Sequence, residues 1–341
     1  MSHLIRNINN NSSFSTEKDE TILQGALRNG HLYPYGCQAG ACGACKARLV
    51  SGTVEHLSRD PGVLSDNEYA QDICLMCQAV PQEDVEIDVK EIARIREIEI
   101  KILPTRIREK TLLCDDVVQL YLSLPSTQKF DFLPGQYINI LLKNGKERSF
   151  SIANTPNQSS MEGLELHIRI VPGGHYSAQV KDSVKVRDIV RIQGPFGTYF
   201  LRKDEQQPII MIAGGTGFAP IKGLIEDALE TKLEQSITLY WGARTQEDLY
   251  LHDLAKKWAE TIKGFKYIPV LSDISDQTIW EGRTGFVHEA IERDFPDASG
   301  HSVYASGPPV MVDSLREIFS KNGLNTEFFY SDAFDYAAEN E

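Results

Sequence analysis

The 341-residue sequence contains no long apolar run, no internal repeat and no basic segment followed by an apolar one at its start. A helix that crosses a bilayer needs roughly 18 or more consecutive apolar residues, and a secretory signal needs a charged segment before its apolar core. The opening residues Met1–Asn7 have neither feature. The sequence therefore predicts no membrane span and no signal peptide, and we expect a cytoplasmic protein.

Positive charge and cysteine are also scarce. The chain has 35 Lys and Arg residues against 48 Asp and Glu residues, which gives a net charge of −13. This balance argues against nucleic acid or a membrane surface as a partner, and it would suit a partner protein with a basic patch. Six cysteines in a chain of 341 residues do not make a disulfide framework. If four of them bind metal, the compartment is reducing.

The most informative stretch is a glycine-rich loop that carries three cysteines. Cys37, Cys42 and Cys45 have the spacing C-x4-C-x2-C, and Cys77 follows further along the chain. This spacing is typical of a plant-type 2Fe-2S cluster, in which thiolates hold the two irons. The glycines between them let backbone N–H groups approach the sulfurs. A zinc site or two disulfides are the alternatives, but a zinc site usually has two C-x2–4-C pairs.

A fifth cysteine competes with Cys77 for the fourth ligand position. Cys74 and Cys77 both lie in the apolar run Ile73–Pro81, which the pattern predicts to be one strand. Residues three apart on a strand face opposite ways, so only one of the two can bind the cluster. The segment Cys77–Pro81 and the alternating residues that follow it resemble plant-type ferredoxins at their last ligand. The resemblance favours Cys77 and makes Cys74 a packed bystander.

The periodicity along the chain predicts three domains with different architectures. Residues 1–92 carry the cysteine loop, a short strand and a helix at 21–28, and we expect the β-grasp fold of a 2Fe-2S ferredoxin domain. Residues 98–203 show alternating strands separated by turn residues, which indicates a small antiparallel barrel. Residues 205–341 alternate strand and helix patterns, which indicates a parallel α/β domain.

Three short motifs lie in the predicted barrel. Arg148–Ser151 reads R-S-F-S, Gly173–Ser177 opens a stretch with a helical pattern, and Gly194–Gly197 ends the barrel region. A glycine beside free N–H groups at a helix start suits an anion. Taken alone, R-S-F-S also fits a surface arginine next to a half-buried phenylalanine. In this order, the three motifs resemble the flavin domain of the ferredoxin–NADP reductase superfamily.

The resemblance implies a bound FAD, with FAD rather than FMN inferred from the order of the domains. It places Arg148 on the pyrophosphate, the Phe150 ring on the isoalloxazine, and Ser151 near flavin N5 as a catalytic residue. It also implies that the backbone at His167 and Ile168 contacts the flavin. The full set implied to bind FAD is Arg148, Ser149, Phe150, Ser151, His167, Ile168, Gly173, Gly174 and Ser177.

Two glycine turns follow strands of the predicted α/β domain. Gly214, Gly215, Thr216, Gly217 and Pro220 follow the first strand, and Ser306, Gly307 and Pro308 follow a later one. Turns after parallel strands meet at the carboxyl edge of the sheet, where doubly wound sheets bind ligands. A tight turn without a ligand is the alternative. The resemblance implies that both turns bind NADH or NADPH and that the Ser306 hydroxyl lies near the nicotinamide as a catalytic group.

The sequence leaves alternative roles open for two further residues, Phe334 and Arg244. The resemblance implies that Phe334 covers the second face of the flavin, although a buried last strand explains it nearly as well. Arg244 follows a strand and could meet the 2′-phosphate of NADPH, an NADH ribose, or solvent.

The resemblance covers essentially the whole chain and implies an NAD(P)H-dependent reductase component. Electrons would pass from NAD(P)H through FAD and the 2Fe-2S cluster to a partner protein, such as an oxygenase or a dehydrase component. Reductases of bacterial oxygenases and CDP-6-deoxy-3,4-glucoseen reductase both fit. The alternative is a redox sensor or ferredoxin-like carrier whose other domains bind regulatory nucleotides.

Overall fold

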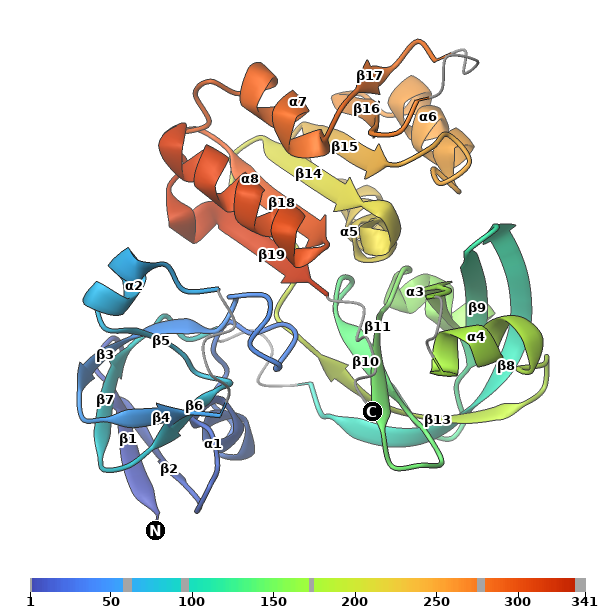
Figure 1. Ribbon diagram of the computed structural model, residues 1–341. Helices are drawn as coiled ribbons and strands as arrows, with labels where there is room; N and C mark the ends of the chain where they lie inside the picture. Colours follow the sequence, from blue (N-terminus) through green and yellow to red (C-terminus); the bar gives the residue numbers. More distant parts are fainter. Residues whose placement is uncertain (1, 58–62, 93–97, 172–174, 275–279, 335–341) are drawn as a thin grey trace. The chain divides into compact units, whose positions relative to one another are not determined.

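The computed structural model describes residues 2–57, 63–92, 98–171, 175–274 and 280–334 (Figure 1). The chain forms two compact units. The first contains residues 1–99, together with residues 332–334, and the second contains residues 100–331. Among the described residues, no helix has the length and apolar content that a membrane span requires.

The first unit is built on a five-stranded sheet. Its strand order is β2-β1-β7-β3-β5, in which β1 (His3–Asn7) runs parallel to β7 (Val85–Asp88) and the other pairs are antiparallel. The remaining strands of the sheet are β2 (Ser12–Thr16), β3 (Lys46–Ser51) and β5 (Ile73–Leu75). Helix α1 (Ile22–Arg28) begins at a Thr21 capping box and turns Ile22, Leu23 and Ala26 inward. This mixed sheet with a packed helix confirms the expected β-grasp architecture.

A small second sheet completes the first unit. Strands β4 (Val54–His56) and β6 (Ala79–Pro81) pair antiparallel, and the short helix α2 (Asp66–Ala70) precedes β5. The run Ile73–Pro81 is therefore not one strand, as the sequence pattern predicted. It is β5, a turn at residues 76–78, and β6. The turn closes with the Gln78 N–H donating to Leu75 O at 2.8 Å.

The second unit begins with a six-stranded antiparallel sheet in the order β11-β10-β13-β8-β9-β12. Its strands are β8 (Lys101–Cys114), β9 (Val117–Ser123), β10 (Tyr137–Leu141), β11 (Glu147–Ser151), β12 (Leu164–Arg169) and β13 (Ile189–Phe196). Ile152, just after β11, forms a bridge with Leu166 in β12, so the two edges of the sheet meet and a barrel results. Helices α3 (Pro156–Glu162) and α4 (His175–Asp182) lie in its connections.

The rest of the second unit is a six-stranded sheet in the order β17-β16-β15-β14-β18-β19. The bounds are β14 (Ile209–Gly214), β15 (Ile237–Ala243), β16 (Phe265–Leu271), β17 (Arg283–Thr284), β18 (Ser302–Gly307) and β19 (Phe329–Ala333). Strands β14 to β18 pair in parallel. Helices lie on both faces (Figure 1): α5 (Phe218–Glu230), α6 (His252–Thr261), α7 (Val287–Asp294) and α8 (Pro309–Lys321). The expected parallel α/β fold is confirmed.

All six residues of β14 and all six of β18 are buried, as expected for central strands covered on both faces. The strand order reverses between them, because the chain first moves outward from β14 to β17 and then returns to β18 on the other side of β14. Such a reversal leaves a crevice at the carboxyl ends of the two strands. The fold therefore places a ligand site at the ends of β14 and β18.

Candidate redox centres and nucleotide site

The four candidate cluster ligands lie together in the first unit. Cys37, Cys42 and Cys45 come from the loop between α1 and β3, and Cys77 comes from the turn between β5 and β6. The thiols hydrogen bond in two pairs, Cys37 with Cys42 and Cys45 with Cys77. Cys42, Cys45 and Cys77 are buried, and Cys37 is partly exposed. Four converging thiols with one near the surface fit a 2Fe-2S cluster that exchanges electrons with a partner.

The backbone of the loop turns its N–H groups toward these sulfurs. Ala39 and Ala41 both donate to Cys37 Sγ, at 3.4 and 3.3 Å, and the Cys37 N–H donates to Cys42 Sγ at 3.4 Å. Gly40 has φ +80°, and a Cβ there would lie 3.0 Å from Gln78 Cγ. The loop therefore needs glycine at this position, and its donors suit the negative charge of ligated sulfur.

Hydrogen bonding separates the two cysteines that compete for the fourth position. The Cys77 thiol hydrogen bonds with Cys45, one of the three loop cysteines. Cys74 lies within β5, where its partner across the sheet is Ala47 of β3. The structure thus supports Cys77 on grounds other than the predicted strand geometry, because the two residues do not share a strand.

The predicted flavin residues lie on two elements of the barrel. Arg148, Ser149, Phe150 and Ser151 form part of β11, the strand that follows β10. Phe150 packs partly against the barrel core, and the Ser149 hydroxyl donates to Asn139 Oδ1 at 2.8 Å. Their roles toward FAD stay predictions.

The second flavin motif lies at the start of α4. Gly173 and Gly174 fall outside the described residues. Ser177 lies in the first turn of the helix, and its hydroxyl accepts the Val171 N–H at 3.2 Å. The helix begins at His175, which confirms a helical stretch at this motif.

The two glycine turns of the α/β domain are packed against each other. Gly214 ends β14, Gly215–Gly217 form a short 3-10 turn, and α5, which contains Pro220, follows directly. A Cβ on Gly217 would lie 2.0 Å from the backbone oxygen of Ser306, so only glycine fits there. The expectation that both turns share one sheet edge is confirmed, because β14 and β18 are parallel neighbours.

An aromatic stack fixes the first glycine turn from beneath. Trp241 in β15 donates its indole N–H to Gly215 O at 3.1 Å, and its ring stacks on Phe218 with centroids 3.7 Å apart. Both side chains are fully buried. The turn is therefore held rigidly, with Thr216 buried beside it.

A cavity of about 700 Å³ opens at this edge of the sheet. It is lined by both glycine turns, the ends of β15 and β16, the start of α7 and α8, and the end of β12. Pro308, Met311 and Phe286 contribute apolar walls, and Phe286 is 59% exposed. Ser306 Oγ, just beneath, is buried and has no hydrogen-bond partner among the described residues. The size and shape suit a nucleotide.

Two arginines line the cavity, and the sequence reasoning identified only Arg244. The other, Arg169, ends β12, and its guanidinium would lie 3.1 Å from a Cβ on Gly215. Arg169 Nε is buried without a partner in the described part of the chain. A donor so close to the glycine turn suits a phosphate of the nucleotide. The sequence did contain a signal for Arg169. It lies two residues after His167 on the same predicted strand, so the two side chains point to the same face.

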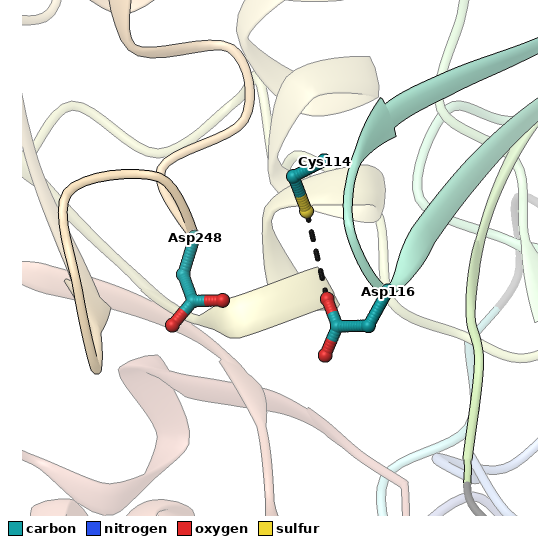
Figure 2. Close-up of side chains that lie close together, drawn as sticks. All are labelled: Cys114, Asp116 and Asp248. Carbon is teal, nitrogen blue, oxygen red and sulfur yellow. Dashed lines mark hydrogen bonds between the residues drawn. The ribbon is translucent and has the colours of Figure 1, made fainter.

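Cys114, Asp116 and Asp248 come together beside this cavity (Figure 2), with ligand atoms all within 4.8 Å of one another. Both aspartates of this group face arginines. Asp116 pairs with Arg169 at 2.5 Å, and Arg244 lies 3.6 Å from Asp116 and 3.5 Å from Asp248. The group is an ion-pair network, and it does not have the open carboxylates of a cation site.

The side chain of His167 lies in a buried hydrogen-bond network. Its side chain is fully buried, with Nε2 2.8 Å from Glu165 Oε1 and Nδ1 3.0 Å from the Tyr250 hydroxyl. Glu165 in turn pairs with Lys222 of α5 at 2.9 Å. This network joins the barrel strand β12 to the helix that follows the first glycine turn. The predicted backbone contact of His167 and Ile168 with FAD stays a prediction.

The remaining site residue is Phe334, which follows β19 and is half-buried. Its position over the flavin stays a prediction.

Comparison with known proteins accounts for all three domains. Residues 7–82 match the 2Fe-2S iron-sulfur cluster binding domain, residues 104–200 the oxidoreductase FAD-binding domain, and residues 211–317 the oxidoreductase NAD-binding domain. The chain belongs to the ferredoxin-fused reductases of the ferredoxin–NADP reductase superfamily. It is an NAD(P)H-dependent oxidoreductase with FAD and a 2Fe-2S cluster as its cofactors.

Individual relatives narrow the class further. The chain is 38% identical to protein RfbI of Salmonella typhimurium, across 98% of this chain and 97% of the relative. It is 37% identical to a CDP-6-deoxy-L-threo-D-glycero-4-hexulose-3-dehydrase reductase of Yersinia pestis, across 94% and 95%. Among solved structures, the Amycolatopsis cytochrome P450 reductase GcoB superposes with a TM-score of 0.77 at 30% identity, across 97% and 98%. Two of these three relatives are thus named as reductases, one of a dehydrase and one of a cytochrome P450.

Proposed function

We propose that this chain is the reductase component for a dehydrase that acts on a nucleotide-linked deoxyhexulose. The observation that carries the proposal is the near full-length similarity to the dehydrase reductase of Yersinia pestis, together with four converging thiols and a nucleotide cavity on one chain. An oxygenase partner is the second candidate, favoured by the likeness to GcoB.

The cofactors define the chemistry: NAD(P)H supplies two electrons as a hydride, FAD can divide them, and the cluster carries one at a time. The chain itself binds and aligns. The Gly214–Gly217 turn, fixed by Trp241, lets a pyrophosphate approach the backbone, and Arg169 supplies positive charge beside it. The buried Ser306 hydroxyl, in β18, has no partner among the described residues and is available for a hydrogen bond to a ligand.

Several finer assignments belong to the same proposal. The domains are taken to span residues 1–92, 98–203 and 205–341. Cys37, Cys42, Cys45 and Cys77 are assigned as the cluster ligands, and Arg148, Phe150 and Ser151 are assigned to FAD. We also infer a reducing, cytoplasmic compartment, and this is supported by six cysteines of which none is in a disulfide.

The test uses the full chain and two electron acceptors. Purified protein with NAD(P)H should reduce both ferricyanide, which can reach the flavin, and cytochrome c, which accepts electrons from an exposed cluster. Cys77→Ser should keep the first activity and lose most of the second. Adding the candidate dehydrase and its substrate should then increase NAD(P)H consumption in the unmodified protein only.

A protein that binds the nucleotide and its cofactors but reduces neither acceptor would be a redox sensor or carrier instead. If both acceptors are reduced and the dehydrase has no effect, the electron route stands and the choice of partner is wrong. An oxygenase component is then the next partner to add.

A further inference from the structure

The charge around Arg244 bears on which nicotinamide nucleotide the cavity accepts. Arg244 follows β15, the second strand of the parallel sheet, and lines the nucleotide cavity. In doubly wound sheets, side chains at the end of this strand meet the adenosine ribose. An acidic residue there accepts from the 2′-hydroxyl of NADH, and an arginine there accommodates the 2′-phosphate of NADPH. This chain has both residue types at the same place.

Arg244 is surrounded by carboxylates. A second hollow of about 760 Å³, adjoining the cavity, is lined by Arg244 as its only cation among the described residues. The acidic residues that line it are Asp115, Asp116, Glu247, Asp248 and Asp273. Five carboxylates against one guanidinium give this hollow a negative charge. Only Asp116 is compensated from elsewhere, through its close pair with Arg169.

The local backbone keeps these carboxylates close to Arg244. Asp248 accepts hydrogen bonds from the N–H and hydroxyl of Thr245, at 3.1 and 3.4 Å, which closes the loop after β15. The Asp273 N–H donates to Arg244 O at 2.9 Å, which ties the end of β16 to the same loop. The negative groups therefore lie on short, anchored segments on either side of the arginine.

A 2′-phosphate and a 2′-hydroxyl would meet different conditions here. The phosphate carries nearly two negative charges, and attraction to one guanidinium would be opposed by the surrounding carboxylates. The hydroxyl carries no charge and can donate a hydrogen bond to a carboxylate. Arg244 is 66% exposed and contacts Asp116 and Asp248 only at 3.5–3.6 Å, so it cannot offset several carboxylates.

We propose that the protein uses NADH and rejects NADPH, and that Asp248 and Asp273 are the residues that determine this choice. The inference rests on the proposed function, since it assumes that the cavity is the nicotinamide nucleotide site. It assigns Arg244 to charge balance within the acidic loop and to the NADH ribose, and not to a phosphate.

The test compares the binding of two nucleotides that differ only in the phosphate. NAD⁺ and NADP⁺ are titrated calorimetrically into the FAD- and cluster-loaded full chain, and kcat/KM is measured for NADH and NADPH with ferricyanide. The unmodified protein should favour the non-phosphorylated nucleotide by on the order of tenfold or more, as expected for a dianion beside uncompensated carboxylates. Raising the salt concentration should reduce the ratio of the affinity for NAD⁺ to that for NADP⁺, because exposed charges are screened.

Two sets of variants distinguish the effect of Asp248 and Asp273 from the effect of the protein's overall negative charge. Asp248→Asn with Asp273→Asn should reduce the ratio by on the order of tenfold, mainly through tighter NADP⁺ binding. Asn retains the oxygen that accepts from Thr245, so the loop is preserved. Asp253→Asn, an exposed acid in the first turn of α6 that lines neither hollow, is the matched control and should leave the ratio unchanged.

Each outcome has a distinct meaning. Equal binding of NAD⁺ and NADP⁺ by the unmodified protein overturns the inference. A preference for NAD⁺ that the double variant does not alter overturns the assignment to Asp248 and Asp273. Failure to bind or oxidise either nucleotide would instead contradict the proposed function itself.

Discussion

Replacing Lys222 by Met tests how the barrel and the α/β domain are held together. The Lys222 side chain is 8% exposed, and its ammonium donates to Ala153 O at 3.1 Å and to Glu165 and Glu226 at 2.9 Å each. Methionine has a similar volume but no charge, so both carboxylates would remain buried without their cation. Removing one partner of a buried pair costs about 3–5 kcal/mol.

This cost can be read as a change in melting temperature. For a domain of this size, 1 kcal/mol corresponds to roughly 2–4 °C, so Lys222→Met should lower Tm by about 6–20 °C. Melting is followed by near-UV circular dichroism and by the fluorescence of released flavin. Lys203→Met is the matched control. Lys203 pairs at 2.7 Å with Asp227, which lies on the same helix as Lys222, but the Lys203 side chain is 29% exposed. The Lys203→Met variant should lose no more than about 1 kcal/mol of its free energy of unfolding.

The pH dependence gives a second, independent readout. Burial would raise the pKa of Glu165, but the hydrogen bond from His167 and the charge of Lys222 outweigh it and lower the pKa to about 2. A carboxyl with a lowered folded pKa stabilises the fold above its unfolded pKa, and this contribution is lost as pH falls through the folded value. The unmodified protein should therefore lose stability between about pH 4.5 and pH 2.

Lys222→Met should have a weaker dependence in that range, because the Glu165 pKa rises once the cation is gone. Lys222→Met combined with Glu165→Gln and Glu226→Gln should recover much of the lost stability, since no uncompensated charge remains. A single Lys222→Met variant that melts with the Lys203→Met control would refute the reasoning.

Three further predictions concern the cofactors and the nucleotide turn. Cys77→Ser should lose the visible absorbance of the iron–sulfur cluster, and Cys74→Ser should keep it; the reverse pattern would exchange the two assignments. Arg148→Ala should weaken FAD binding by about 2 kcal/mol, measured by fluorescence titration of the apoprotein, because a charge-assisted hydrogen bond is lost. Trp241→Phe removes the donor to Gly215 and should raise KM for the nucleotide several-fold at unchanged FAD content; an unchanged KM would show that stacking alone fixes the turn.

The sequence predicted the architecture well wherever a pattern is local. The alternating pattern of residues 98–203 corresponds to antiparallel strands such as β10 (Tyr137–Leu141), and both glycine turns lie at strand ends, as predicted. The failure at Ile73–Pro81 has a physical cause. An apolar run indicates that the residues are buried, but it does not show whether the backbone is extended or turns. Here Met76 and Cys77 are buried in a turn rather than in a strand. The Met76 N–H bonds to Cys45 O at 3.0 Å, a contact that no local pattern reveals.

The charged parts of the site were the least predictable. Asp116 and Arg169 are 53 residues apart, and only the pairing of β9 with β12 brings their ends together. Lys222 of α5 is buried and pairs with Glu165 of the barrel, 57 residues away along the chain. Propensity and periodicity describe single elements, whereas these contacts depend on how elements pack. The Arg244 environment could likewise be stated only as three alternatives from the sequence.

The division into two compact units gives the electron route a direct test. The hydride-accepting and nucleotide-binding domains both lie within residues 100–331, and the four thiols lie within residues 1–99. A chain that begins at Ile98 should therefore fold, retain FAD and reduce ferricyanide with NADH, because domains with their own cores usually fold alone. It should lose most cytochrome c reduction, since the bulky acceptor takes electrons at the cluster. If the shortened chain reduces cytochrome c as fast as the full chain, electrons leave from the flavin, and the ferredoxin domain serves docking or sensing instead.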